Sequence, residues 1–160
     1  MKGYPRRFGA LLIGVVALTW ITGLLLAPTT LALHASIELP WRLPGAARVG
    51  VVAAHLGAAL VFVFLGGALW SLHMRQGWRH GRQRRSGLAM ASLLIFATGS
   101  AVAVLYAGSE WLADGAALLH LGSGLAFVLP LAPHWWRAQK PQHRRRRSSR
   151  WPALRPGGPP

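Results

Sequence analysis

Four long stretches of the chain contain no Lys, Arg, Asp or Glu, and this pattern constrains the fold more than any other feature. They cover residues 8–27, 49–72, 88–107 and 115–132. Each is close to the roughly 20 helical residues that cross a hydrocarbon core about 30 Å thick. Since lipid offers no partner to a backbone amide, such segments fold as helices. The sequence therefore predicts an all-α, four-helix transmembrane bundle.

The charged residues predict how this bundle is oriented. Charged residues make up only 13% of the chain, and Lys and Arg outnumber Asp and Glu by 18 to 3. The basic residues cluster before the first stretch, between the second and third, and after the fourth, whereas the acids Glu38, Glu110 and Asp114 lie in the other loops. By the positive-inside rule, both termini are expected in the cytoplasm. We interpret the basic clusters as topology signals and expect no nucleic-acid partner.

Both ends of the chain need separate interpretation. The first stretch follows MKGYPRR, which is typical of a signal peptide, but it is longer than a usual h-region and lacks a clear small-x-small cleavage site after it. We therefore expect a retained helix. Residues 137–160 combine an arginine run with a Pro/Gly-rich end, which predicts a basic, disordered cytoplasmic tail after a membrane domain of residues 1–136.

Short matches relate the two halves of the chain. WITGLLLAP in the first stretch is similar to FATGSAVAV in the third, and HLGAALVFV, which begins at His55, is similar to HLGSGLAFV, which begins at His120. Each match is weak by itself because membrane helices use few residue types. Their common order and the shared histidine favour two pseudo-repeated helical hairpins.

Each histidine of the repeat is followed by another on the same predicted helix. His55 and His73 are 18 residues apart, about five turns, and His120 and His134 are 14 apart, which leaves them within about 40° of one face. Both helices run in the same direction across the membrane. We therefore expect His55 and His120 at similar depths in the outer half, and His73 and His134 near the cytoplasmic surface.

Two interpretations of these histidines stay open. An intramembrane histidine can hydrogen-bond a neighbouring helix, and one near the headgroups can act as an anchor. Alternatively, polar side chains in a bilayer often mark function, and two imidazoles that face each other can bind a metal ion or hold a porphyrin from both sides. The neighbours Ala58, Ala59, Phe62, Gly124 and Phe127 suit a flat disc, and they equally suit helix packing.

Other chemistries fit less well. The chain has no cysteine, which excludes thiolate ligands, iron–sulfur ligation and covalent c-type haem attachment. An ion transporter would place carboxylates within the membrane, but all three acids lie outside the apolar stretches. The sequence also shows no nucleophile beside a base and no pair of carboxylates. We therefore expect no self-sufficient enzyme.

The order of these motifs resembles a known family. A TG helix, a histidine-rich second helix, another TG helix and a fourth helix with H-x13-H are similar to the bacterial di-haem membrane cytochromes b, over about residues 8–137. This family includes cytochrome subunits of hydrogenases and formate dehydrogenases and four-helix cytochromes associated with flavinylated partners. The resemblance implies two b-type haems with bis-histidine ligation. His55 and His120 would hold the outer haem, and His73 and His134 the inner one.

The same resemblance implies a cellular role. Such a protein lies in the bacterial inner membrane and passes electrons between the quinone pool and an extracytoplasmic redox protein, for example a flavinylated one. Because they lie in the outer loop near the membrane surface, His34 and Glu38 are expected to exchange the protons of a bound quinone. A haem-free membrane anchor or assembly subunit is the alternative, followed by a transition-metal transporter.

The second helix departs from the pattern of that family. The usual spacing would put its lower ligand at Leu69, and His73 comes one turn later. A tilt of the helix, or the proline bend near His134, would have to absorb this mismatch of about 6 Å, about one turn of rise.

Several neighbouring residues are assigned supporting roles. Arg75, Arg79 and Arg137, beside the inner histidines, are expected either to pair with haem propionates or only to set the topology. Gly23 and Gly99, near the depth of the outer histidines, are expected either to admit the edge of the haem or to pack helices.

Overall fold

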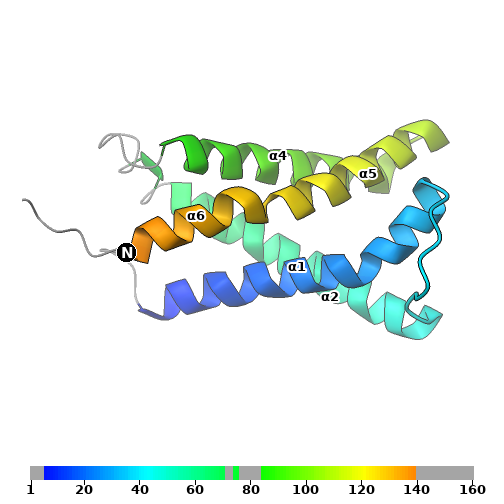
Figure 1. Ribbon diagram of the computed structural model, residues 1–160, viewed down its shortest axis with the longest axis horizontal. Helices are drawn as coiled ribbons and strands as arrows, with labels where there is room; N and C mark the ends of the chain where they lie inside the picture. The colour runs from blue at the N-terminus through cyan, green and yellow to red at the C-terminus, as the bar shows by residue number, and fades with distance from the viewer. Residues whose placement is uncertain (1–5, 71–73, 76–83, 140–160) are drawn as a thin grey trace, which may run out of the picture.

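Helices make up nearly all of the structure. The computed structural model describes residues 6–70, 74–75 and 84–139. Within these ranges its helices are α1 (Arg6–His34), α2 (Gly45–Leu69), α4 (Arg84–Tyr106), α5 (Glu110–Ala126) and α6 (Val128–Gln139), and no strand is present (Figure 1). Four segments, Arg7–His34, Gly45–Leu69, Arg84–Tyr106 and Glu110–Arg137, are long and apolar enough to cross a membrane. The prediction of an all-α, multi-pass membrane bundle is confirmed.

The first helix runs well past its predicted end at residue 27. Pro28 lies inside α1 and is fully buried, although its missing N–H removes one helical hydrogen bond. Two residues later, Thr30 Oγ1 donates to the Leu26 carbonyl at 3.3 Å. The helix stops just before Ser36, whose φ of 55° lies in the left-handed region and turns the chain away.

The fourth span is divided into two helices. Pro130 has no N–H to donate to the Ala126 carbonyl, so the regular ladder breaks and Phe127 separates α5 from α6. Helical hydrogen bonds continue on both sides of this point. The Phe127 N–H donates to the Ser123 carbonyl at 3.0 Å, and the Leu131 N–H donates to the Phe127 carbonyl at 3.3 Å. Pro130 then occupies the first turn of α6, where proline is tolerated.

The last helix ends later than the sequence suggests. It extends to Gln139, so residues 137–139 belong to a helix and not to the predicted tail. The sequence sets the start of the tail by its charge, but a helix can carry Arg137 in its last turn next to its carbonyl end. Residues 140–160, which make up the rest of the predicted tail, lie outside the described residues.

Packing follows the two predicted hairpins. α1 packs along α2, and α4 packs along α5. The two hairpins join mainly through a contact between α1 and α5, and α6 continues the fourth span along α4 (Figure 1). The helices that carry His55 and His120, α2 and α5, belong to different hairpins. Any site that needs both histidines therefore forms only when the hairpins associate.

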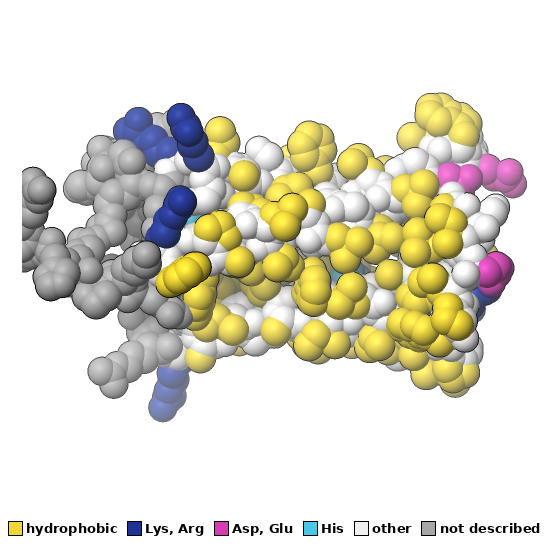
Figure 2. Space-filling model, in the orientation of Figure 1, with side chains coloured by type: hydrophobic (Ala, Val, Ile, Leu, Met, Phe, Trp, Pro, Cys, Tyr) yellow, Lys and Arg dark blue, Asp and Glu magenta, His cyan; other side chains and the backbone are white. Residues whose placement is uncertain are grey.

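The interior is small and the outside is apolar. The buried side chains are short ones such as Ala58, Ala116 and Ala117, with Leu65 among them, whereas large residues such as Phe64 point outward and are mostly exposed. Apolar side chains cover the length of the bundle in Figure 2, while basic side chains gather at one end and acidic ones at the other. This distribution is expected when hydrocarbon surrounds the helices and charges remain in the headgroup layers.

Candidate functional site

Two of the predicted site residues meet between the hairpins. His55 on α2 and His120 on α5 have ring centroids 6.0 Å apart, with planes nearly perpendicular at 85°. Both side chains are partly buried. Residues 65 positions apart in sequence are thus brought together at one depth of the bundle, as the spacing predicted.

The surroundings of His55 define which of its nitrogens is protonated. Its Nδ1 lies 3.0 Å from the carbonyl oxygen of Thr19 and 3.0 Å from Thr22 Oγ1, both on α1. A carbonyl oxygen can only accept, so Nδ1 must carry the hydrogen. In a neutral imidazole the lone pair is then on Nε2, the atom that ligates metals in such an arrangement.

His120 is oriented in the same way. Its Nδ1 lies 2.8 Å from the carbonyl oxygen of Ala97 on α4, so this ring also carries its hydrogen on Nδ1. Both histidines therefore share one tautomer, and each uses Nδ1 to bond the preceding helix of its own hairpin. A metal-bound histidine commonly makes this second hydrogen bond, because it fixes the ring and raises its basicity as a ligand.

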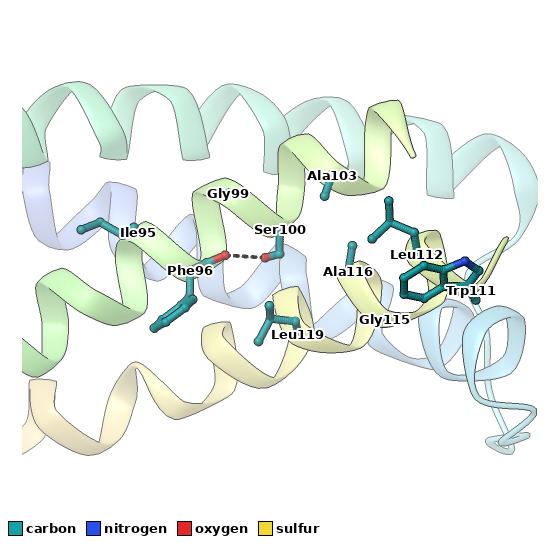
Figure 3. Close-up of a pocket in the computed structure, with 10 residues that line it drawn as sticks. All are labelled: Ile95, Phe96, Gly99, Ser100, Ala103, Trp111, Leu112, Gly115, Ala116 and Leu119. Atoms are coloured by element: carbon teal, nitrogen blue, oxygen red, sulfur yellow. Dashed lines mark hydrogen bonds between the residues drawn. The ribbon is translucent and has the colours of Figure 1, made fainter. Parts of the chain in front are cut away.

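A buried hydroxyl stands beside each carbonyl acceptor. Thr22 Oγ1 donates to the Leu18 carbonyl at 2.6 Å and lies 3.1 Å from that of Thr19. Ser100 Oγ makes the matching contacts with Phe96 at 2.6 Å and Ala97 at 3.1 Å. The first of the Ser100 contacts is drawn in Figure 3. Only 5% of each of Thr22 and Ser100 is exposed, so both hydroxyls belong to the interior.

These contacts correct the register of the internal repeat. Aligning the two sequences on their TG pairs makes Thr22 equivalent to Thr98. The hydrogen bonds of the hydroxyl groups instead make Thr22 equivalent to Ser100, two residues later. Two residues rotate a helix position by about 200°, so Thr98 cannot occupy the equivalent face. Sequence reasoning missed Ser100. The available signal was a hydroxyl residue inside an apolar span, where it needs a hydrogen-bond partner.

The two predicted glycines lie in different environments. A Cβ at Gly23 would come within 3.1 Å of His55 Cε1, so the missing side chain lets the imidazole approach α1 closely. A Cβ at Gly99 would meet open space. Gly23 is thus in contact with the histidine ring, and Gly99 is exposed on the surface of the α4–α5 hairpin.

The exposed face around Gly99 forms an apolar groove between α4 and α5 (Figure 3). Its volume is about 460 Å³. The lining residues are Ile95, Phe96, Gly99, Ser100, Ala103, Trp111, Leu112, Gly115, Ala116 and Leu119. Through Ser100, the groove lies next to the carbonyl that accepts from His120.

A second pair of rings meets below the histidines. Phe62 and Phe127 have centroids 5.7 Å apart and planes at 87°. Each follows its histidine by seven residues, about two turns, so the facing rows of α2 and α5 remain in register over this distance. Edge-to-face rings at this separation attract one another. This contact lies about two turns from the histidines, on the predicted cytoplasmic side.

The predicted inner site is only partly described. His73 and Arg79 lie outside the described residues. His134 is on α6, and its Nδ1 lies 3.0 Å from Ser86 Oγ on α4. Arg75 and Arg137 are exposed. Ligation by His73 and His134, and propionate binding by the arginines, stay predictions.

The outer loop residues pair differently from the expected grouping. His34 Nδ1, at the end of α1, lies 2.7 Å from Asp114 Oδ1 on α5. Glu38 instead pairs with Arg42, four residues along the chain. The sequence grouped His34 with Glu38 because both were expected near the outer membrane surface, and it could not show that α5 begins beside the end of α1. Their role in proton exchange stays a prediction.

The outer pair passes a simple test of fit for an iron-centred group. Because a metal–imidazole nitrogen bond is about 2 Å long, two imidazoles on opposite sides of one ion have centroids about 6 Å apart. The observed 6.0 Å agrees with this separation. In the described part of the chain, no three His, Asp or Glu side chains gather into a larger metal-binding group. Two histidines are what a bis-histidine haem requires.

Comparison with known protein families, with curated proteins and with solved structures finds no match for this chain.

Proposed function

We propose that the chain is a membrane electron carrier that binds a b-type haem between α2 and α5, where His55 and His120 would hold its iron. The observation that carries the proposal is the facing pair of rings, 6.0 Å apart and both with Nδ1 bonded to a backbone carbonyl. Hydrogen bonds from Nδ1 leave Nε2 available as the ligand on each ring.

The residues of the chain then have distinct tasks. His55 and His120 hold the iron, and the carbonyls of Thr19 and Ala97 fix the rings. Short residues such as Ala58, one turn from His55, are buried in the interior near the ligands. When bound, haem supplies one-electron chemistry that the side chains themselves do not offer, and its potential depends on these ligands and on the apolar surroundings.

The wider role is proposed from the resemblance to di-haem cytochromes b. In it, His73 and His134 hold a second haem near the cytoplasmic side, with Arg75 and Arg137 beside its propionates. Electrons pass between membrane quinone and an extracytoplasmic redox protein of the bacterial inner membrane. The membrane setting is supported by the four apolar spans.

A haem-free anchor or assembly subunit is the second candidate. Each outer histidine forms a hydrogen bond between the two helices of its own hairpin. A histidine that only stabilises helix packing would form the same bond. The 6.0 Å ring contact across the hairpins favours the haem proposal, because hydrogen bonding within a hairpin does not require the two rings to meet.

A difference spectrum decides between the two candidates. The chain is expressed with ample haem supply, purified in detergent, and measured after reduction with dithionite against the oxidised sample. We expect a b-type spectrum and iron in the purified protein. A protein that folds and carries no haem would refute the electron-carrier proposal. Zinc or copper in place of iron, measured by mass spectrometry, would instead favour a metal transporter.

A further inference from the structure

The two outer histidines differ in the number of acceptors around Nδ1. His120 has the Ala97 carbonyl at 2.8 Å, whereas His55 has both the Thr19 carbonyl and Thr22 Oγ1 at 3.0 Å. One N–H can be shared between two acceptors in a three-centre bond. The ring of His55 is therefore held by a backbone atom and by a side chain, and only the side chain can be removed by substitution.

The hydroxyl of Thr22 is aimed so that it accepts from the ring. Its only hydrogen points to the Leu18 carbonyl, the shorter of its two carbonyl contacts at 2.6 Å. The lone pairs of Oγ1 are thus left for His55 Nδ1–H. Because Thr22 is only 5% exposed, this arrangement lies in the interior of the bundle.

Gly23 fixes the same ring from the next position. Its missing Cβ leaves His55 Cε1 only 3.1 Å from where that atom would lie. A Cβ at this position would require the imidazole to shift by a few tenths of an ångström. Thr22 and Gly23 therefore set both the hydrogen bond and the rotation of one ring.

We propose that Thr22 is a positioning residue that lowers the reduction potential of the outer haem through His55, with Gly23 setting the orientation of the ring. The inference rests on the proposed function. A stronger hydrogen bond from Nδ1–H makes an imidazole a better electron donor, which stabilises the more positive, oxidised iron. Removing the Thr22 hydroxyl therefore raises the potential.

The size of the effect follows from one hydrogen bond. A typical hydrogen bond changes an equilibrium by a few-fold to about tenfold. A tenfold change in the ratio of oxidised to reduced haem corresponds to about 59 mV for one electron. We therefore expect a rise of up to about this size in Thr22→Val, a variant that keeps the branched shape and loses the hydroxyl.

The test is a redox titration of the full-length protein in detergent, followed by absorbance. Thr22→Val is compared with Thr22→Ser, which keeps the hydroxyl and is expected to stay near wild type. Ser100→Ala is the matched control on the other hairpin, because its hydroxyl bonds carbonyls and not the ring in the recorded contacts. We expect its potential to stay near wild type, because the hydrogen of Ser100 points to the nearer Phe96 carbonyl, and the Ala97 carbonyl already accepts from His120.

Electron paramagnetic resonance of the oxidised haem gives a second measurement, because it reports the relative orientation of the two imidazole planes. Gly23→Ala is expected to change this signal, since the new Cβ must displace the ring of His55. If Thr22→Val does not accumulate in the membrane, the Gly23→Ala spectrum decides, and an unchanged signal overturns the proposal.

The outcomes separate this inference from the proposed function. If the wild-type protein binds no haem, the proposed function fails. If it binds haem and Thr22→Val keeps both the haem and the wild-type potential, the role of Thr22 is refuted while the electron-carrier proposal survives. A raised potential in Thr22→Val that Thr22→Ser restores supports the inference.

Discussion

The two hairpins hold their histidines by the same kind of contact, with one difference. In both, the histidine of the second helix donates to a carbonyl of the first, and a buried hydroxyl follows that carbonyl by three residues. In the α1–α2 hairpin the hydroxyl of Thr22 also contacts the ring. In the α4–α5 hairpin the recorded contacts of the Ser100 hydroxyl are with backbone carbonyls.

This comparison shows what the internal repeat has kept. In the sequence alignment Thr22 is equivalent to Thr98, whereas in hydrogen bonding it is equivalent to Ser100. Hydrogen-bond geometry around the histidine is therefore common to the halves even where the residues are not. The remaining asymmetry means that equivalent changes in the two hairpins need not have equal effects.

The largest effect is expected when either outer histidine is removed. His55→Ala and His120→Ala should each abolish the outer haem, because one imidazole is a poor substitute for two axial ligands across a bundle. Haem per chain, measured from the difference spectrum, should fall by half if two haems are bound. It should fall to zero if the outer haem is the only one.

The control for this pair is His34→Ala, which changes a histidine at the outer end of α1 that contacts Asp114. Its haem content should match wild type. Full haem content in either His55→Ala or His120→Ala would contradict the assigned ligands.

The next effect compares the outer pair with the inner one. His134→Ala should remove the inner haem and leave the outer one, so that two haems per chain become one. The His73→Ala variant should give the same result if these two residues share one iron. Quantifying haem against protein in both variants tests this. A wild-type ratio of one haem per chain, unchanged by His134→Ala, would show that no inner haem exists.

The features that were predictable from sequence depend on averages over many residues. Four spans follow from the absence of charge over about 20 residues each, because a lipid environment penalises every charge. The meeting of His55 and His120 follows from helix direction and position, which need no knowledge of individual contacts. Both predictions therefore survive small errors in helix ends.

The features that were missed depend on single contacts between helices. The roles of Thr22 and Ser100 require the rotation of α1 and α4 about their axes, which the short TG motif could not define. The pairing of His34 with Asp114 requires knowing where α5 begins beside α1. A proline bend near the end of the fourth span was expected, but its division into two helices at Phe127 was not.

Gly23 and Gly99 offer a sharper comparison with a smaller effect. Gly23→Ala should destabilise the bundle by about 1–3 kcal/mol, because its Cβ meets the His55 ring at 3.1 Å and overpacking has this cost. Gly99→Ala should be neutral or stabilising by up to about 1 kcal/mol, since the space is open and alanine favours a helix.

Thermal unfolding in detergent, followed by circular dichroism, gives the melting temperatures of both glycine variants. A lower value for Gly23→Ala with an unchanged or higher value for Gly99→Ala supports the asymmetry between the hairpins. Equal melting temperatures would mean that the His55 ring moves freely and that Gly23 does not constrain it.

The smallest effect concerns the contact that joins the hairpins at their outer end. Asp114→Asn should destabilise the bundle by no more than about 0.5–1 kcal/mol, because the side chains of His34 and Asp114 are 25% and 46% exposed and water screens their attraction. Glu38→Gln is the matched control, since its partner Arg42 lies within the same loop and joins no hairpins. If Asp114→Asn lowered the melting temperature as much as Gly23→Ala, the association of the hairpins would depend on this outer hydrogen bond more than on the packing around the histidines.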